Sequence, residues 1–240
     1  MRLRLRSTKL GKIRFVGHRD MARVWDRALR RAGMPVVFTE GFTPRPRISF
    51  GLALPMGAES LAEYVDVEVD VERVDPSTPD LLDLDRVPAQ LGALLPDGVD
   101  VTAAAFVQRA DGSLQEIVTS CTWEFWADHL GVEQLAGALD LLARDEIRVE
   151  RERKRERRID DVRPLVLDLR VERGRLIADL ATTGRALRPA ELSGLAFPDT
   201  DPLDVRVVRT HQWTSHDGAR REVLPARPQP VAALDRKVGA

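Results

Sequence analysis

Hydrophobic and polar residues alternate along several short stretches of this 240-residue chain, and a period of two predicts β-strands that bury one face. Leucines alternate with arginines over 1–7, and valines alternate with carboxylates over 63–70. Between these stretches, the apolar residues of 18–33 recur at helical spacing, and Gly33 and Pro35 end that helix. The pattern therefore predicts a strand, a helix and further strands at the start of the chain.

The same order of elements recurs after a turn at 110–113. Each half reads β-α-β-β-β-α-β, the first over 1–109 and the second over 114–213, and a loose tail is expected at 224–240. This order is typical of a split βαβ, ferredoxin-like unit with one added strand. The sequence therefore predicts an α+β fold of two tandem ferredoxin-like units with antiparallel sheets. The other expected strands are 35–38, 47–54, 99–107, 116–126, 146–150, 165–171, 175–181 and 203–213, and the other expected helices are 78–95, interrupted near Pro88, 131–144 and 188–197.

Charge is segregated along the chain, although the formal net charge is only −1. Residues 1–50 hold 13 lysines and arginines against 3 acidic residues, whereas residues 51–120 hold 3 against 14. Some of these opposite charges are expected to pair inside the fold, because the first and third core strands of a ferredoxin-like unit are neighbours. Cross-strand ion pairs would then neutralise the first strand, and an exposed phosphate-binding stripe is the alternative. The residues concerned are Arg2, Arg4 and Arg6 on one strand and Asp66, Glu68 and Asp70 on the other.

The composition excludes several classes of protein. Cys121 is the single cysteine, so the chain cannot form an internal disulfide or hold a cysteine-bound zinc or iron–sulfur centre. No phosphate-binding glycine loop, HExxH or GxSxG motif occurs, and we expect no metal and no cofactor. The chain has no apolar run of 18 residues, and its start lacks the apolar core of a signal peptide. We therefore expect a cytoplasmic protein without membrane contact.

The helix of 18–33 carries a row of arginines opposite its apolar side. Such a row suits nucleic-acid phosphates or an acidic protein surface, and a solvated helix face is the alternative. His18 begins the helix, where free backbone N–H groups favour anions. It is a weak candidate for acid–base catalysis and otherwise a structural residue. The row consists of Arg19, Arg23, Arg27 and Arg30.

The segment GFTPRPRISF at 41–50 combines stiffness with positive charge. Its two prolines hold the chain extended, and Arg45 and Arg47 point the same way in an extended chain. A stiff loop with two guanidinium groups loses little entropy when it binds phosphate or carboxylate. Phe42 either stacks on a base or fills the core. The alternative is a rigid connector whose arginines have no ligand.

The segment RERKRERR at 151–158 holds six basic and two acidic residues, and it predicts a hairpin arm or a flexible loop. Basic loops of this kind often follow nucleic-acid backbones, and a solvated run of charge is the alternative. Nothing in the sequence indicates a preference for DNA. The candidates in this segment are Arg151, Arg153, Lys154 and Arg155.

Three segments of the first half together resemble a known family. They are the helix start FVGHRD at 15–20, the loop at 41–50 and the segment at 54–64. On these segments the chain resembles the radical-SAM-associated domain family of unknown function, over 1–110. The resemblance implies a supporting or substrate-delivery role beside a radical SAM enzyme. It also implies RNA as a partner, because stand-alone members are encoded near RNA-processing genes. The chain itself lacks the three-cysteine cluster motif of radical SAM enzymes.

These features together predict a non-catalytic RNA-binding or RNA-maturation accessory protein associated with radical SAM systems. Arg45 and Arg47 would contact backbone phosphates, and the helix row and 151–158 would extend the path. Two alternatives stay open. One is a docking module that binds a radical SAM protein through the acidic region 51–120, and the other is a metal-independent ribonuclease that uses His18.

Overall fold

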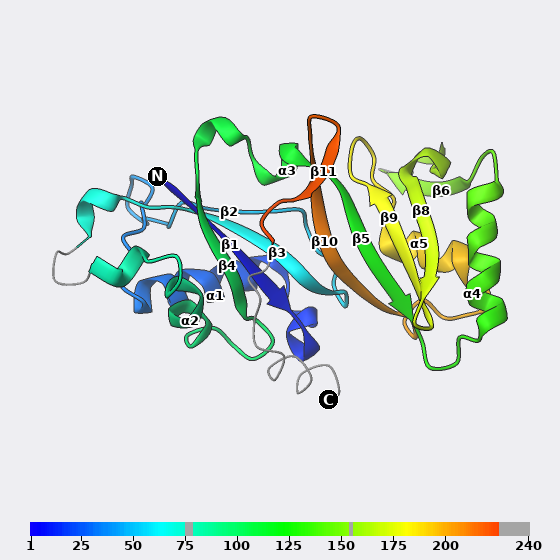
Figure 1. Ribbon diagram of the computed structural model, residues 1–240, viewed down its shortest axis with the longest axis horizontal. Helices are drawn as coiled ribbons and strands as arrows, with labels where there is room; N and C mark the ends of the chain where they lie inside the picture. Colours follow the sequence, from blue (N-terminus) through cyan, green and yellow to red (C-terminus); the bar gives the residue numbers. More distant parts are fainter. Residues whose placement is uncertain (75–78, 154–155, 226–240) are drawn as a thin grey trace. The chain divides into compact units, whose positions relative to one another are not determined.

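The computed structural model describes residues 1–74, 79–153 and 156–225, and Figure 1 shows its helices and strands. Contacts between residues divide the chain into two compact units. The first unit comprises Met1–Ile117 together with the described residues from 222 onward, and the second comprises Val118–Arg221. Both units combine helices with antiparallel strands, so the predicted α+β class is confirmed. The predicted tail, 224–240, lies outside the described residues from position 226.

The first unit is built on an antiparallel sheet. Its strands are β1 (Arg2–Lys9), β2 (Ile48–Phe50), β3 (Glu59–Glu68) and β4 (Val101–Val107), and its helices are α1 (His18–Arg31), α2 (Val87–Gly92) and α3 (Leu114–Ile117). The strand order is β4-β1-β3-β2, because β1 pairs with both β3 and β4, and β2 pairs with β3. The elements from β1 to β4 follow the split βαβ order, and the ferredoxin-like assignment stays an interpretation.

Three predicted elements of the first unit differ from the structure. The expected strand 47–54 is limited to the three residues of β2. The expected strand 35–38 forms only two isolated bridges, Val36 with Val69 and Phe38 with Pro46. The expected helix 78–95 is reduced to a 3-10 turn and the short helix α2. Pro88 does not interrupt that helix, because it lies in the first turn, where a backbone N–H has no helical acceptor.

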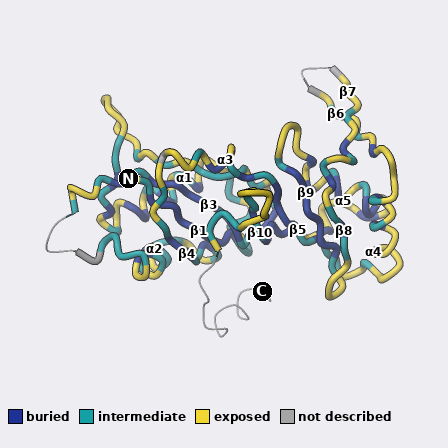
Figure 2. The backbone as a smooth tube through the Cα atoms, turned by 45° about the horizontal axis from the view of Figure 1, so that its top comes forward, coloured by how far each residue is buried: buried dark blue, intermediate teal, exposed yellow. Residues whose placement is uncertain are grey.

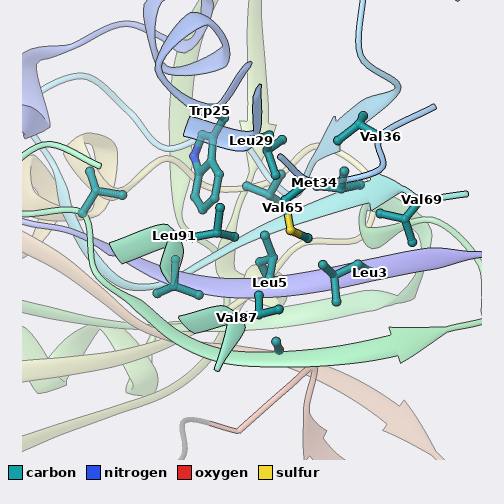
Figure 3. Close-up of a cluster of buried hydrophobic side chains, with 14 of the residues drawn as sticks. Leu3, Leu5, Trp25, Leu29, Met34, Val36, Val65, Val69, Val87 and Leu91 are labelled. Atoms are coloured by element: carbon teal, nitrogen blue, oxygen red, sulfur yellow. The ribbon is translucent and has the colours of Figure 1, made fainter. Parts of the chain in front are cut away.

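The core of the first unit lies between its sheet and the helices α1 and α2 (Figure 3). Leu5 and Val65 face each other across β1 and β3, and both are buried. Trp25 and Leu29 of α1 and Leu91 of α2 pack against them. In Figure 2, β1 and β3 are among the most buried parts of the chain. The apolar residues that recur with a period of two in the strands and those that recur at helical spacing in 18–33 therefore pack into one core.

Ion pairs neutralise the other face of β1. Arg4 lies next to Asp66 in the register, and its Nε and Nη2 donate to the two carboxylate oxygens at 2.8 and 2.9 Å. Arg2 approaches Asp66 at 3.6 Å, and Arg6 pairs with Glu222 at 2.7 Å. The predicted neutralisation is thus confirmed for Arg4 and Asp66, whose side chains are both buried. The alternative, an exposed phosphate-binding stripe on β1, is wrong because these guanidinium groups form ion pairs with carboxylates of the same chain.

The second unit also contains antiparallel strands. Its strands are β5 (Val118–Trp126), β8 (Val166–Glu172), β9 (Arg175–Ala181) and β10 (Arg206–His216), in the order β10-β5-β9-β8, and β11 (Ala219–Glu222) pairs with β10. The helices α4 (Val132–Ala138) and α5 (Pro189–Ala196) lie between these strands in sequence, and α4 packs against β8, β9 and α5. A separate hairpin is formed by β6 (Arg148–Arg153) and β7 (Glu156–Asp161). The 3-10 helices among the described residues are Gly11–Phe15, Val71–Arg73, Pro79–Leu82, Arg109–Asp111, Leu139–Ala143 and Arg163–Leu165.

A polar network in the second unit is centred on Asp179 of β9. Arg220 donates to its two carboxylate oxygens at 3.0 and 2.7 Å, Arg170 donates at 3.2 Å, and the Thr122 hydroxyl donates as well. The Arg220 guanidinium also lies over the Trp213 ring, 4.3 Å from its centre. Burial by itself raises the pKa of Asp179, but the hydrogen bonds from Arg220 and Thr122 outweigh burial. The pKa therefore lies below its ordinary value.

This lowered pKa predicts how acid acts on the second unit. A carboxyl whose pKa is lower in the folded chain stabilises the fold above its unfolded pKa of about 3.9, and that contribution is lost as pH falls through the lowered value. We expect Asp179→Asn to reduce the free energy of unfolding at pH 7 by about 1–3 kcal/mol, the cost of disturbing buried polar partners. Below about pH 4 the variant should lose less further stability than the parent. Urea unfolding at both pH values measures this, with Glu133→Gln as the exposed control. Equal acid sensitivity in the parent and Asp179→Asn would contradict it.

Candidate nucleic-acid interface

The helix α1 presents the predicted arginine row to solvent. Its apolar residues, including Trp25, face the sheet, so the arginines lie on the opposite side and all are exposed. Two of the four have acidic partners on the same helix, at 2.9 Å for Arg23 and Asp20 and at 2.7 Å for Arg30 and Asp26. Exposed pairs of this kind contribute about 0.3–0.5 kcal/mol, so they leave the arginines available. Arg19 and Arg27 form no ion pair within the described part of the chain.

Residues 37–47 form a narrow hairpin, called the 37–47 hairpin below. The Arg47 N–H donates to the Val37 carbonyl at 2.8 Å, and the Thr39 N–H donates to the Arg45 carbonyl at 2.8 Å. The Arg45 N–H in turn donates to Thr39 Oγ1 at 3.0 Å. These bonds join the two arms and explain how a segment with two prolines keeps a fixed shape.

The tip of the 37–47 hairpin is wholly exposed. Residues 40–45 all face solvent, and the Phe42 side chain is as exposed as in an extended peptide, at 110%. The alternative that Phe42 fills the core is therefore wrong. The Phe42 ring is therefore accessible to a partner, and a stacking contact needs such an accessible ring face.

The two arginines of the hairpin differ in their surroundings. Arg45 is exposed, and its guanidinium has no ion-pair partner among residues 1–74, 79–153 and 156–225. Arg47 lies 3.4 Å from a carboxylate oxygen of Glu68, and its side chain is 43% exposed. Glu68, which lies opposite Arg2 in the register of β1 and β3, thus also pairs with Arg47. The hairpin thus holds one fully available guanidinium and one that is partly neutralised.

A stacking contact joins the hairpin to the arginine row. The Arg30 guanidinium lies 4.5 Å from the centre of the Phe38 ring, within the range of a cation–π interaction. Phe38 bridges Pro46 inside the hairpin. The C-terminal end of α1 therefore adjoins the base of the hairpin.

His18, at the start of α1, borders a pocket rather than a catalytic pair. Its ring meets the Phe50 ring edge-on, with centres 4.8 Å apart and planes inclined by 77°. Leu54 and Glu63 line the same pocket, as does Lys9. The three segments that carry the family resemblance thus meet here: His18 belongs to the first, Phe50 to the second, and Leu54 and Glu63 to the third. Spacing along the chain does not reveal this meeting.

A weaker sequence signal did point to the pocket. The row that faces the core along β1 reads Leu3, Leu5, Ser7, and the facing row along β3 reads Val67, Val65, Glu63. In each row the third position is polar where the alternation would place another apolar residue. This change marks the place where the apolar core ends.

The predicted arm at 151–158 falls on β6 and β7, and its first arginine is held by carboxylates. The Arg151 guanidinium donates to both carboxylate oxygens of Glu191 at 2.8 and 2.6 Å and lies 3.5 Å from Asp160. Its side chain is 9% exposed, so we correct the assignment of Arg151 from binding to structure. Arg153 ends β6, and the other two candidates, Lys154 and Arg155, lie outside the described residues.

Fold and surface together define an α+β protein whose first unit presents an arginine-bearing helix and an aromatic-tipped hairpin to solvent. The chain belongs to the family described as "Uncharacterized protein conserved in bacteria (DUF2344)", whose model matches residues 2–189. No curated protein matches the chain. An association with radical SAM enzymes is not part of this match and stays a prediction.

Two further features bear on function. None of the helices in the described ranges is both long and apolar enough to cross a membrane. Within the same ranges, no three His, Cys, Asp or Glu side chains gather as a group that could hold a metal ion.

Proposed function

We propose that this protein is a non-catalytic RNA-binding accessory protein that holds single-stranded RNA on its first unit. The observation that carries the proposal is the tip of the 37–47 hairpin, where the fully exposed Phe42 stands beside the unpaired Arg45. An unstacked base can cover the Phe42 ring, and the neighbouring phosphate can accept from the guanidinium. Base stacking on an aromatic side chain contributes about 1–3 kcal/mol, which explains why an exposed phenylalanine is useful there.

The rest of the surface extends the path of the strand. From the hairpin, the Arg30–Phe38 contact leads to α1, where Arg19 and Arg27 are available for further phosphates. Such contacts give affinity and register without reading sequence. The hydrogen bonds between the two arms of the hairpin reduce the entropy lost on binding, because the tip is already held in place.

The salt dependence of binding tests this proposal. Three to four available arginines would release a similar number of counterions, so the slope of log affinity against log salt should be about −2 to −3 for a single strand. We expect the affinity for a single-stranded RNA of mixed sequence to fall about 20- to 50-fold between about 50 and 200 mM salt. Fluorescence anisotropy with a labelled oligonucleotide measures it. Affinity that is absent at low salt, or that salt leaves unchanged, would contradict the proposal.

The two alternatives have less support from these contacts. Docking of a radical SAM partner through 51–120 would use exposed carboxylates such as Glu72, Asp97 and Glu116. Asp66 is not among them, because it is buried against Arg4, and Glu59 is buried and accepts from the Gly11 N–H at 2.6 Å. Co-purification of an iron–sulfur protein without RNA would favour docking. Ribonuclease activity needs a role for His18 in turnover, and an unchanged rate in His18→Ala would exclude it.

A further inference from the structure

The strand β8 of the second unit is an edge strand, because among the described residues it pairs with β9 on one side only. An edge strand presents a row of backbone N–H and C=O groups that can pair with another extended chain. Proteins often protect such an edge with proline, lysine or a bulge, and β8 contains neither proline nor lysine. The register shift in its pairing with β9 lies between Val166 and Asp168, so the strand is regular from Asp168 to Glu172.

Two apolar side chains of β8 are exposed at this edge. Leu167 is 53% exposed and Val171 is 39% exposed, whereas Leu169 between them is buried. Removing apolar area from water is favourable, and a strand that pairs with β8 would cover part of both side chains. The edge therefore combines the backbone groups that another strand needs with apolar side chains that gain from its approach.

The charges along β8 are complementary to a second copy of the same strand. The Arg170 guanidinium donates to Asp168 at 2.9 Å and to Glu172 at 2.7 Å, and each of these three side chains is at least 40% exposed. When two copies of β8 pair antiparallel about Leu169, Asp168 of each copy lies opposite Arg170 of the other. A pairing about Arg170 would instead place arginine opposite arginine and Asp168 opposite Glu172, and like charges that lie directly opposite are destabilising.

We propose that this protein forms a dimer in which β8 pairs antiparallel with β8 of a second copy, centred on Leu169. The same register places Leu167 of each copy opposite Val171 of the other, so the exposed apolar side chains meet as well. Five to seven residues of edge bury less area than the about 1,200–2,000 Å² of a stable interface, and the dimer is therefore weak and reversible, with a Kd of about 10–100 μM. The inference does not depend on RNA binding.

A charge reversal tests the dimer by sedimentation equilibrium of the full chain between about 5 and 300 μM. Asp168→Arg should weaken dimerisation at least about 10-fold, because it places arginine opposite arginine at two positions. Combining it with Arg170→Asp restores opposite charges at both positions, so the double variant should dimerise like the parent. The introduced arginine then lies opposite Asp179 in the register of β8 and β9, which keeps a cation beside that carboxylate. Circular dichroism shows whether both variants fold.

Disulfide cross-linking tests the register with the single variants Leu167→Cys and Val171→Cys. Residues that lie opposite have Cβ atoms about 4.5–5.5 Å apart, close to what a disulfide spans, whereas the same position in the two copies would be about 13 Å apart. Mild oxidation should therefore cross-link a mixture of the two variants and leave each variant alone uncross-linked. The parent is the control for Cys121, which is buried.

Several results would overturn the proposed pairing. They are a parent that stays monomeric at about 300 μM, far above the expected Kd, and a folded double variant that dimerises no better than Asp168→Arg. A mixture of the two cysteine variants that does not cross-link, or one variant that cross-links as well alone as in the mixture, would also overturn it.

Discussion

Replacing Asp66 by alanine should lower the free energy of unfolding by about 3–5 kcal/mol, the usual effect of removing one partner of a buried ion pair. Asp66 is 2% exposed and accepts two hydrogen bonds from Arg4, whose side chain is 4% exposed. Without the carboxylate, the Arg4 guanidinium stays buried beside β3 without its partner. Urea unfolding followed by circular dichroism measures the change.

A paired substitution identifies the cause of that loss. Arg4→Met combined with Asp66→Leu replaces both charges by apolar groups of similar size, and such replacements are often neutral or stabilising. We therefore expect the double variant to be much closer to the parent than Asp66→Ala alone. A double variant as unstable as Asp66→Ala would show that packing, and not an unpaired charge, accounts for the effect.

The second large effect concerns RNA. The combined change Phe42→Ala and Arg45→Ala removes the stacking ring and the one fully available guanidinium of the hairpin. We expect the affinity for single-stranded RNA to fall about 10- to 100-fold, since stacking alone is worth about 1–3 kcal/mol. The salt slope should become less steep by about 0.7, because one phosphate contact is lost. Stability should stay within about 0.5 kcal/mol, as both side chains are exposed.

A matched control is available in the second unit. Leu203 is 92% exposed, and Arg144 is exposed as well. Leu203→Ala with Arg144→Ala therefore removes one apolar side chain and one positive charge from residues that are not part of the proposed surface. This control should bind RNA like the parent. If it weakens binding as much as the hairpin variant, the effect reflects net charge and the hairpin assignment fails.

Much of the first unit followed from local patterns. The alternation in 1–7 and 63–70 predicted both the buried leucine face and the charged face, and the register of β1 and β3 places Arg4 beside Asp66 as that pattern requires. The helix at 18–33 was predicted for the same kind of reason, since its apolar residues share one side. These features depend on residues close in sequence or on two strands with complementary charge.

The parts that could not be predicted depend on tertiary neighbours. Whether Phe42 stacks or fills the core depends on what surrounds the hairpin tip, and the sequence left both choices open. Arg151 looks like a binding residue in a basic run, and only the approach of Glu191 from α5 makes it structural. The pocket draws on three distant segments, so it exists only after β1, β3 and α1 have packed.

The central claim is that the 37–47 hairpin and α1 hold single-stranded RNA, and ultraviolet cross-linking tests it most directly. Irradiate the complex with a single-stranded RNA at low salt, digest both components, and locate the cross-linked peptides by mass spectrometry. The account predicts that the peptide containing Phe42 carries the main cross-link and that this cross-link disappears at high salt. Cross-links confined to the second unit, with none in residues 18–47, would contradict it.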